Sequence, residues 1–137
     1  MRVLGIGVDM VEVGRFRDMT ADPRPTRQFL TEGESQRMKL EALTPRSLAG
    51  IFAAKEAIIK ASGSAWPQRA IFFNDIEVDH RPNGAPHARF LDAVPANVQI
   101  LLSVSHTQEH AIAFAMVVQG DNGNERRPGQ DTADDLL

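Results

Sequence analysis

The pattern of apolar and polar positions divides the first third of the chain into one strand and two helices. The run VLGIGVDM at residues 3–10 is rich in β-branched residues and glycine, which predicts a buried strand that ends at Asp9. Apolar residues at helical spacing predict a short amphipathic helix over residues 11–19. After a cluster of prolines, residues 26–43 are predicted to form a second helix, with Thr31 as a candidate cap for its first turn.

The clearest helix in the pattern follows Pro45. The run LAGIFAAKEAIIKA continues it from Pro45 or Ser47 for about four turns, until Ser62 and Gly63 end it. Large apolar residues recur at helical spacing, and the alanines between them allow a neighbouring element to approach closely. We therefore expect this helix to be buried on most sides.

The rest of the chain is dominated by predicted strands, over residues 71–78, 87–90, 99–106 and 111–118. Arg81-Pro82-Asn83-Gly84 is a hairpin turn signal between the first two. Together with the helices, these strands predict an α+β domain over residues 1–118. Residues 119–137 are polar, contain glycine and proline and show no periodicity, so we expect a disordered tail.

The composition narrows the class of protein. A length of 137 residues suits one small domain, and association into an oligomer would cover surface that such a domain leaves exposed. The chain has no cysteine, which excludes a disulfide scaffold and a thiolate zinc site. No stretch approaches the roughly 18 apolar residues of a membrane span. Because Met1 leads straight into the first strand, we expect a cytoplasmic protein with no signal peptide and no membrane contact.

The charges are unevenly placed along a chain whose net charge is −3. Arginines gather early, and acids gather in the last residues. The early arginines form either a solvated helix face or a surface for an acidic partner. A nucleic-acid interface would need a clearly basic domain with interleaved aromatic residues. The chain has no tyrosine and one tryptophan, so we expect no nucleic-acid partner.

Acidic and basic side chains stand within two of the apolar runs. Asp9 is either a cap or turn acid or a metal ligand. Glu56 and Lys60 share one helix face, either as a surface ion pair or as the lining of a polar cleft, which a buried helix favours. Lys55 lies about 100° around the helix from Glu56 and is the better candidate for plain solvent exposure.

The segment SVSHTQEH places His106 at the end of an apolar strand. His106 either makes a local hydrogen bond or joins Ser103, Ser105 and Thr107 as donors to phosphate oxygens. Two carboxylates, one lysine and a hydroxyl-rich strand end suit phosphate chemistry with Mg²⁺, which takes one or two carboxylates and completes its shell with water and phosphate. Neither a P-loop nor a dinucleotide fingerprint occurs.

Three segments together resemble a known family. GIGVDMVEVGRF at 5–16, FAAKEAIIKA at 52–61 and SVSHTQEHAIA at 103–113 are similar, in order and spacing, to the signature segments of the holo-acyl-carrier-protein synthases. The likeness covers nearly the whole chain up to about Val118. It implies Mg²⁺-dependent transfer of 4′-phosphopantetheine from coenzyme A to a carrier-protein serine, releasing 3′,5′-ADP, in fatty-acid or polyketide biosynthesis. It also implies a three-stranded antiparallel sheet with helices, and a homotrimer with active sites between subunits.

The resemblance also implies roles for individual residues. Asp9 and Glu56 would bind Mg²⁺, with Mn²⁺ as an alternative, and Lys60 would neutralise the pyrophosphate and the departing 3′,5′-ADP. Glu56, directly or through a bound water, is the candidate for assisting the loss of the serine proton. The nucleotide would be contacted, in part from a neighbouring subunit, by Lys60, Gly63, Asn83, Gly84, Pro86, Ser105, His106 and Thr107.

The family's partner is a short, acidic, helical carrier protein, and the resemblance gives the early arginines a role in binding it. The residues expected on that surface are Arg15, Met19, Arg24, Arg27 and Phe52.

The sequence departs from the family pattern on the nucleotide side. Ile51 stands where many relatives have arginine, Ala85 replaces a lysine, and the segment 62–65 replaces an FGTG sequence. These changes bear on coenzyme A affinity and not on the groups needed for transfer. Two alternatives stay open: a non-catalytic relative that binds carrier protein or nucleotide, and a Mg²⁺-dependent hydrolase of nucleotide pyrophosphates.

Overall fold

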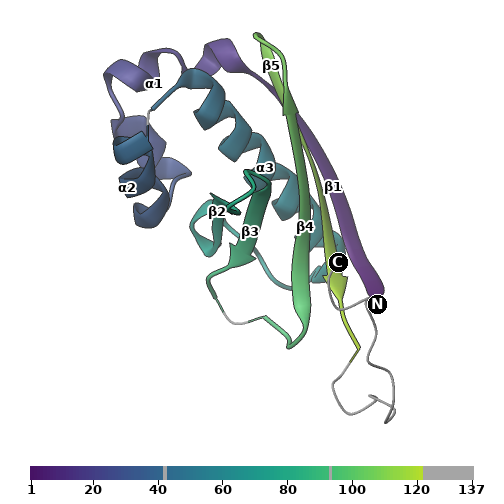
Figure 1. Cartoon of the computed structure of the whole chain (residues 1–137). Helices are drawn as coiled ribbons and strands as arrows, with labels where there is room; N and C mark the ends of the chain where they lie inside the picture. Colours follow the sequence, from purple (N-terminus) through teal and green to yellow (C-terminus); the bar gives the residue numbers. More distant parts are fainter. Residues whose placement is uncertain (42, 93, 122–137) are drawn as a thin grey trace.

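The computed structural model describes residues 1–41, 43–92 and 94–121, which form one α+β unit. Its centre is an antiparallel sheet with the strand order β1-β5-β4. The long helix α3 (Pro45–Ala65) packs along one face of this sheet (Figure 1). A separate ribbon, β2 (Ile76–His80) and β3 (Pro86–Phe90), lies on the same side as α3 (Figure 1). The strands of the central sheet are β1 (Arg2–Glu12), β4 (Val98–His106) and β5 (His110–Gln119).

Short helical segments occupy one end of the molecule and precede α3 in the chain (Figure 1). Among them α2, with 10 residues, is the longest. They are the 3-10 turn η1 (Val13–Phe16), the turn α1 (Asp18–Ala21), the 3-10 turn η2 (Arg24–Gln28) and the helix α2 (Glu32–Glu41). A third 3-10 turn, η3 (Phe73–Asp75), leads into β2.

The contact between α3 and β1 has no room for side chains on the strand. A Cβ atom added at Gly7 would lie 2.0 Å from the carbonyl oxygen of Ala57, and one at Gly5 would lie 2.0 Å from that of Ala61. Ala57 and Ala61 are fully buried at this contact. Because neither strand nor helix carries bulk here, the two backbones lie closer together than ordinary helix-on-sheet packing allows.

A cluster of aromatic rings joins the helical end of the molecule to α3. The Phe52 ring centroid lies 5.4 Å from that of Phe16, 5.3 Å from that of Phe29 and 5.4 Å from that of Phe73. These rings meet in edge-on or tilted geometries, which aromatic quadrupoles favour. The cluster fixes the short segments even though each is too small to be stable alone.

The structure corrects two predictions about the first third of the chain. The first strand does not end at Asp9, because Met10 to Glu12 pair with Ile112 to His110 of β5. This ladder replaces the start of the helix predicted over 11–19, where η1 and α1 follow instead. The helix predicted over 26–43 is divided into η2 and α2.

The division of that helix has a local cause at Thr31. Phe29 and Leu30 turn into the core, at 4% and 5% exposure. Thr31 then begins α2 as predicted, because its hydroxyl accepts from Glu34 N and its own N–H donates to the Glu34 carboxylate. This reciprocal capping box starts a new helix instead of continuing the old one.

Later boundaries also shift. Helix α3 is capped by Thr44, whose side chain accepts from Ser47 N, and it runs on to Ala65, beyond the predicted end at 62–63. Strand β2 begins only at Ile76, because η3 occupies Phe73–Asp75. The predicted hairpin turn is confirmed: Gly84 has φ of +84° and donates its N–H to Arg81 O.

The domain continues past the predicted boundary at residue 118. Gln119 pairs with Arg2 and Val98, and Gly120 N donates to Asn97 O. The Met1 amino group lies 3.3 Å from the Asp121 carboxylate. The rest of the predicted tail, 122–137, lies outside the described residues.

The face of the sheet turned away from α3 is apolar and uncovered. Val8 faces Phe114, and Met10 faces Ile112, across the β1–β5 ladder. These four side chains are exposed, as are Ile6 on β1 and Leu101 on β4. A contiguous apolar face of this kind is typical of a surface that another protein covers. Among the described helices, none is both long and apolar enough to cross a membrane.

We expect Gly7→Ala to lower the free energy of unfolding by about 1–3 kcal/mol, because the new methyl group meets the backbone of Ala57 and α3 must move. Urea denaturation measures the change. Gly63→Ala is the control, since a Cβ there meets no atom within 4 Å. That variant should be slightly more stable than the unmodified chain. Equal stability of the two variants would contradict the close contact.

Candidate active site

One polar cluster forms where α3 crosses the second half of β1. Lys60 Nζ donates to the Val8 carbonyl oxygen at 2.9 Å and lies 3.2 Å from Asp9 Oδ1. The Asp9 side chain is only 17% exposed, whereas that of Lys60 is 53% exposed. The Lys60 side chain therefore contacts a mostly buried carboxylate while it remains open to solvent. The structure brings together two of the predicted catalytic residues, which are 51 positions apart in sequence.

Glu56 lies one turn before Lys60 on the same face of α3. It is half-buried, and its carboxylate makes no hydrogen bond or ion pair with any described residue. Its carboxylate oxygens are not buried, so they are open to solvent and to a cation. The described part of the chain contains no cluster of three or more metal-ligating side chains. Two carboxylate groups nevertheless fit Mg²⁺, which usually keeps several waters and takes substrate phosphate as well.

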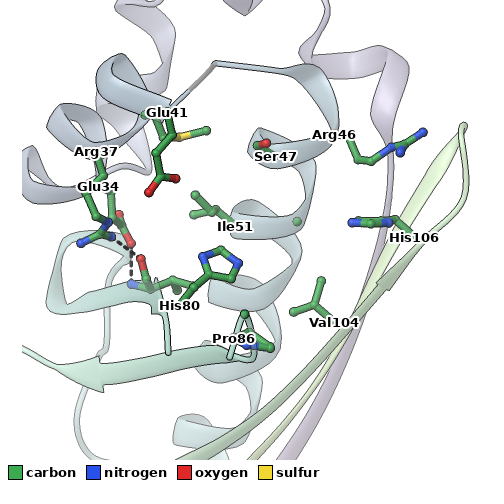
Figure 2. Close-up of a pocket in the computed structure, with 14 residues that line it drawn as sticks. Glu34, Arg37, Glu41, Arg46, Ser47, Ile51, His80, Pro86, Val104 and His106 are labelled. Carbon is green, nitrogen blue, oxygen red and sulfur yellow. Dashed lines mark hydrogen bonds between the residues drawn. The ribbon is translucent and has the colours of Figure 1, made fainter. Parts of the chain in front are cut away.

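A cavity of about 270 Å³ lies at the opposite edge of the sheet, between α2, α3, β4 and the β2–β3 hairpin (Figure 2). Its walls are apolar where Ile51, Val104 and Pro86 line it. Arg46 and His106 stand at the β4 side, and Glu41 and His80 stand nearer α2 and β2 (Figure 2). The apolar walls suit a nucleobase, and the cationic or titratable groups at the ends suit a phosphate attached to it.

The two sites lie on different sides of α3. With about 100° per helical residue, Glu56 lies about 140° and Lys60 about 180° around the helix from Ile51, which lines the cavity. Asp9 belongs to β1 and His106 to β4, and these strands form the two edges of the sheet (Figure 1). A single copy of the chain therefore holds the carboxylate cluster and the cavity apart.

A fully buried ion pair lies behind the inner wall of the cavity, which Glu34 helps to line. Lys55 Nζ lies 2.5 Å from Glu34 Oε1, and both side chains have 0% exposure. The ammonium also donates to Phe29 O at 2.7 Å and Phe73 O at 3.0 Å. The carboxylate accepts from the N–H of Val78 at 2.6 Å in addition to the capping bond from Thr31. The pair ties α2, α3, η3 and β2 together.

The prediction that Lys55 is exposed to solvent is wrong. Lys55 lies only about 40° around α3 from Ile51, on the side that α2 and η3 cover. Burial lowers the pKa of Lys55, and the Glu34 carboxylate opposes that shift. The lysine stays buried because every proton of its ammonium has an acceptor.

The predicted nucleotide residues divide into two groups. Gly84, Pro86 and His106 line the cavity. The others do not: Asn83 accepts from Ala85 N within the hairpin turn, and Thr107 accepts from the N–H groups of Glu109 and His110 at the β4–β5 turn. Ser105 is exposed on β4, and Gly63 is exposed in the last turns of α3.

Several cavity residues were missed at the sequence level. They are Arg37, Glu41, Arg46 and His80. Arg46 could have been identified from the sequence, because a cation in the first turn of a helix interacts unfavourably with the helix dipole. A residue placed there against the dipole is a candidate for a functional role. Arg37 and His80 could not have been identified in this way, since they reach the cavity only through the packing of α2 on β2.

The predicted carrier-binding residues gather at the helical end of the molecule. The Arg15 guanidinium lies 4.8 Å from the centroid of the Phe52 ring, and Met19 packs half-buried against the core. Arg24 is held by two bonds to the Asp22 carboxylate, both of 2.9 Å. Arg27 is exposed. All five residues predicted for this surface thus belong to η1, α1, η2 or the adjoining part of α3.

Comparison with known proteins shows the family to which the chain belongs. Residues 5–115 match the family model described as the 4′-phosphopantetheinyl transferase superfamily. A holo-[acyl-carrier-protein] synthase of Clostridium kluyveri is 34% identical over 122 residues, which are 84% of this chain and 90% of the relative. The crystal structure of the Bacillus anthracis synthase, in complex with coenzyme A (3′,5′-ADP), superposes with a TM-score of 0.70 at 30% identity, covering 86% of this chain and 98% of that one. The synthase of Mycobacterium tuberculosis gives a TM-score of 0.65 at 32% identity, covering 87% and 100%.

The fold and the match to the family model thus define a phosphopantetheinyl transferase, and the chain belongs to the 4′-phosphopantetheinyl transferase superfamily. Within it, the relatives place the chain among the holo-[acyl-carrier-protein] synthases.

We expect Lys55→Met to lower the free energy of unfolding by about 3–5 kcal/mol, because it leaves the Glu34 carboxylate buried without its cation. Lys55→Met combined with Glu34→Gln should cost less than Lys55→Met alone, since the amide removes the buried charge and still accepts a hydrogen bond. Urea denaturation of both, with the exposed Lys60→Met as control, measures these costs. A Lys55→Met cost as small as that of the control would contradict the role of the pair.

Proposed function

We propose that this chain transfers 4′-phosphopantetheine from coenzyme A to the serine hydroxyl of an apo-acyl carrier protein. The observation that carries the proposal is the cluster of Asp9, Glu56 and Lys60, with one sheltered carboxylate held by lysine and a second left without a partner. In the reaction the serine oxygen forms a bond to the β-phosphorus, and the bond from that phosphorus to 3′,5′-ADP breaks. The serine proton must leave, and 3′,5′-ADP must depart with its charge stabilised.

The residues of the cluster have distinct tasks. Asp9 and Glu56 would hold Mg²⁺, or Mn²⁺ in its place, and the ion would act as a Lewis acid toward the phosphate oxygens. The Lys60 ammonium is exposed enough to reach the pyrophosphate while Asp9 orients it, and it stabilises charge on the departing 3′,5′-ADP. Glu56 is the candidate acceptor for the serine proton, since no other described residue holds its carboxylate.

The cavity is the proposed nucleotide site. Arg46 and His106 are placed for phosphate at one end, and Ile51, Val104 and Pro86 offer apolar contact to a base. Many relatives have an arginine at the position of Ile51, whereas Ile51 offers only apolar contact. The proposed contact with phosphate therefore falls to Arg46 and His106. At about 270 Å³ the cavity is just below the roughly 300 Å³ at which ligand sites begin, as expected for half of a shared site.

The separation of the two sites favours an assembly in which they meet. A copy that offers its β1 edge to the β4 edge of its neighbour brings one carboxylate cluster to one cavity. Such a head-to-tail contact closes into a ring when the rotation between copies permits. The uncovered apolar face of β1, β5 and β4 supplies the surface that such a contact would bury. We therefore propose a homotrimer with its active sites between subunits.

The carrier protein would dock at the helical end of the molecule. The Arg15–Phe52 stack and the half-buried Met19 offer a cation beside apolar surface, which suits an acidic helix. We propose that the reaction takes place in the cytoplasm and serves fatty-acid biosynthesis or, with another carrier, polyketide biosynthesis.

Mass spectrometry of an apo-carrier incubated with coenzyme A and Mg²⁺ should show the gain of one phosphopantetheine, and EDTA should abolish it. Glu56→Gln should lower the rate by about 10²–10⁴-fold while the protein still folds, because the amide neither accepts the proton nor binds the ion well. A fully active Glu56→Gln variant would contradict the assignment. Release of 3′,5′-ADP without a carrier would favour the hydrolase, and no product with several carriers would favour a binding module.

A mixing experiment tests the shared site. Glu56→Ala disables the cluster and Arg46→Ala weakens the cavity, so each variant alone should be inactive or slow. After the two variants are dissociated and reassembled together, roughly a quarter of the interfaces should pair an intact cluster with an intact cavity, and activity should return in that proportion. Reassembly of either variant with itself is the control. No recovery in mixed oligomers would show that the site lies within one copy.

A further inference from the structure

A second cavity, of about 160 Å³, lies between η2 and α2. Its floor is apolar: Leu30 and Met38 are 5% and 6% exposed, and Leu43 is half-buried beside them. Met38 also lines the proposed nucleotide cavity, so the two cavities are neighbours. No residue of the catalytic cluster lines it.

The rim of this cavity is basic. Arg24, Arg27 and Lys39 line it, and all three are exposed. Arg24 is neutralised by Asp22, whereas Arg27 and Lys39 form no ion pair with any described residue. The rim therefore keeps two uncompensated positive charges beside an apolar floor. None of the described residues that line the cavity is acidic.

The apolar floor and the basic rim together favour one kind of ligand. The volume lies well below the roughly 300 Å³ at which small-molecule sites begin, but it suits one apolar side chain. The free cations favour carboxylates on either side of that side chain. An apolar residue flanked by acids, on the surface of a helix, has this chemistry.

We propose that this cavity is a second anchor for the carrier protein, taking one apolar side chain of an acidic helix while Arg27 and Lys39 meet carboxylates on either side. The proposal rests on the proposed function, and it extends the docking surface from the Arg15–Phe52 stack across η2 to α2. Arg24 and Arg27 belong to the η2 segment that joins the two parts. Two separated anchors would fix the orientation of the carrier, which a single patch of charge does not.

The kinetic test uses two substitutions of equal charge on one helix. Lys39→Gln and Gln36→Glu each change the net charge by one negative unit, and only Lys39 lines the cavity. Lys39→Gln should raise KM for the carrier about two- to fivefold, the size expected of one exposed ion pair, and should weaken its dependence on salt. Gln36→Glu should leave that KM almost unchanged, and neither should alter KM for coenzyme A. Equal effects of the two substitutions on carrier KM would overturn the proposal.

A binding test is independent of catalysis. Because the chain has no cysteine, Ser35→Cys places a single thiol at the cavity for a photo-crosslinking label. This label should capture purified apo-carrier, and the same label at the exposed position Gln68→Cys, which lines neither cavity, should not. Equal capture at both positions, or none at Ser35→Cys in a variant that still forms holo-carrier, would overturn the second anchor. Loss of transfer in the unmodified chain would instead defeat the proposed function.

Discussion

The close contact between α3 and β1 is the constraint on which the rest of the structure depends. Gly5 and Gly7 leave no side chain between the strand and the carbonyl groups of Ala61 and Ala57, so the helix lies directly on the sheet. At that depth Lys60 reaches the Val8 carbonyl and the Asp9 carboxylate. A bulkier strand would lift the helix and carry its charged face away from Asp9. The two glycines thus contribute to the site by letting the helix and the strand approach closely.

The same contact turns the opposite side of α3 toward α2 and the hairpin, where a second constraint operates. The segments there are short and irregular, and their backbone groups have few partners in regular secondary structure. Lys55 and Glu34 satisfy four of them, from Phe29, Phe73, Val78 and Thr31. An apolar pair would avoid the cost of burying two charges but would leave these groups unsatisfied. The ion pair holds the wall on which the nucleotide cavity depends.

The sequence predicted the elements that depend on local pattern. The α+β class, the hairpin turn at Gly84 and the cap at Thr31 follow from periodicity and turn chemistry. The family resemblance predicted that Asp9, Glu56 and Lys60 belong to one site, and the direct contact of Asp9 with Lys60 is a finding of the structure. The failures depend on distant contacts. Pairing with β5 extends β1 beyond Asp9, and packing against α2 and η3 buries Lys55, a residue that helical geometry alone leaves free to face water. Arg37 and His80 reach the cavity only once α2 lies on β2, which no local pattern encodes.

The division of the proposed active site between copies follows from the geometry of one helix packed on a sheet. A helix packed on a sheet has two flanks, and this one carries the carboxylate cluster on the flank at β1 and the cavity on the flank at β4. The cluster and the cavity cannot meet across the helix that separates them. A ring solves the problem, because every copy then uses both flanks and buries the apolar face of its sheet. In the proposed assembly, folding, association and completion of the site are therefore coupled: a copy that does not associate keeps an exposed apolar face and has no complete site.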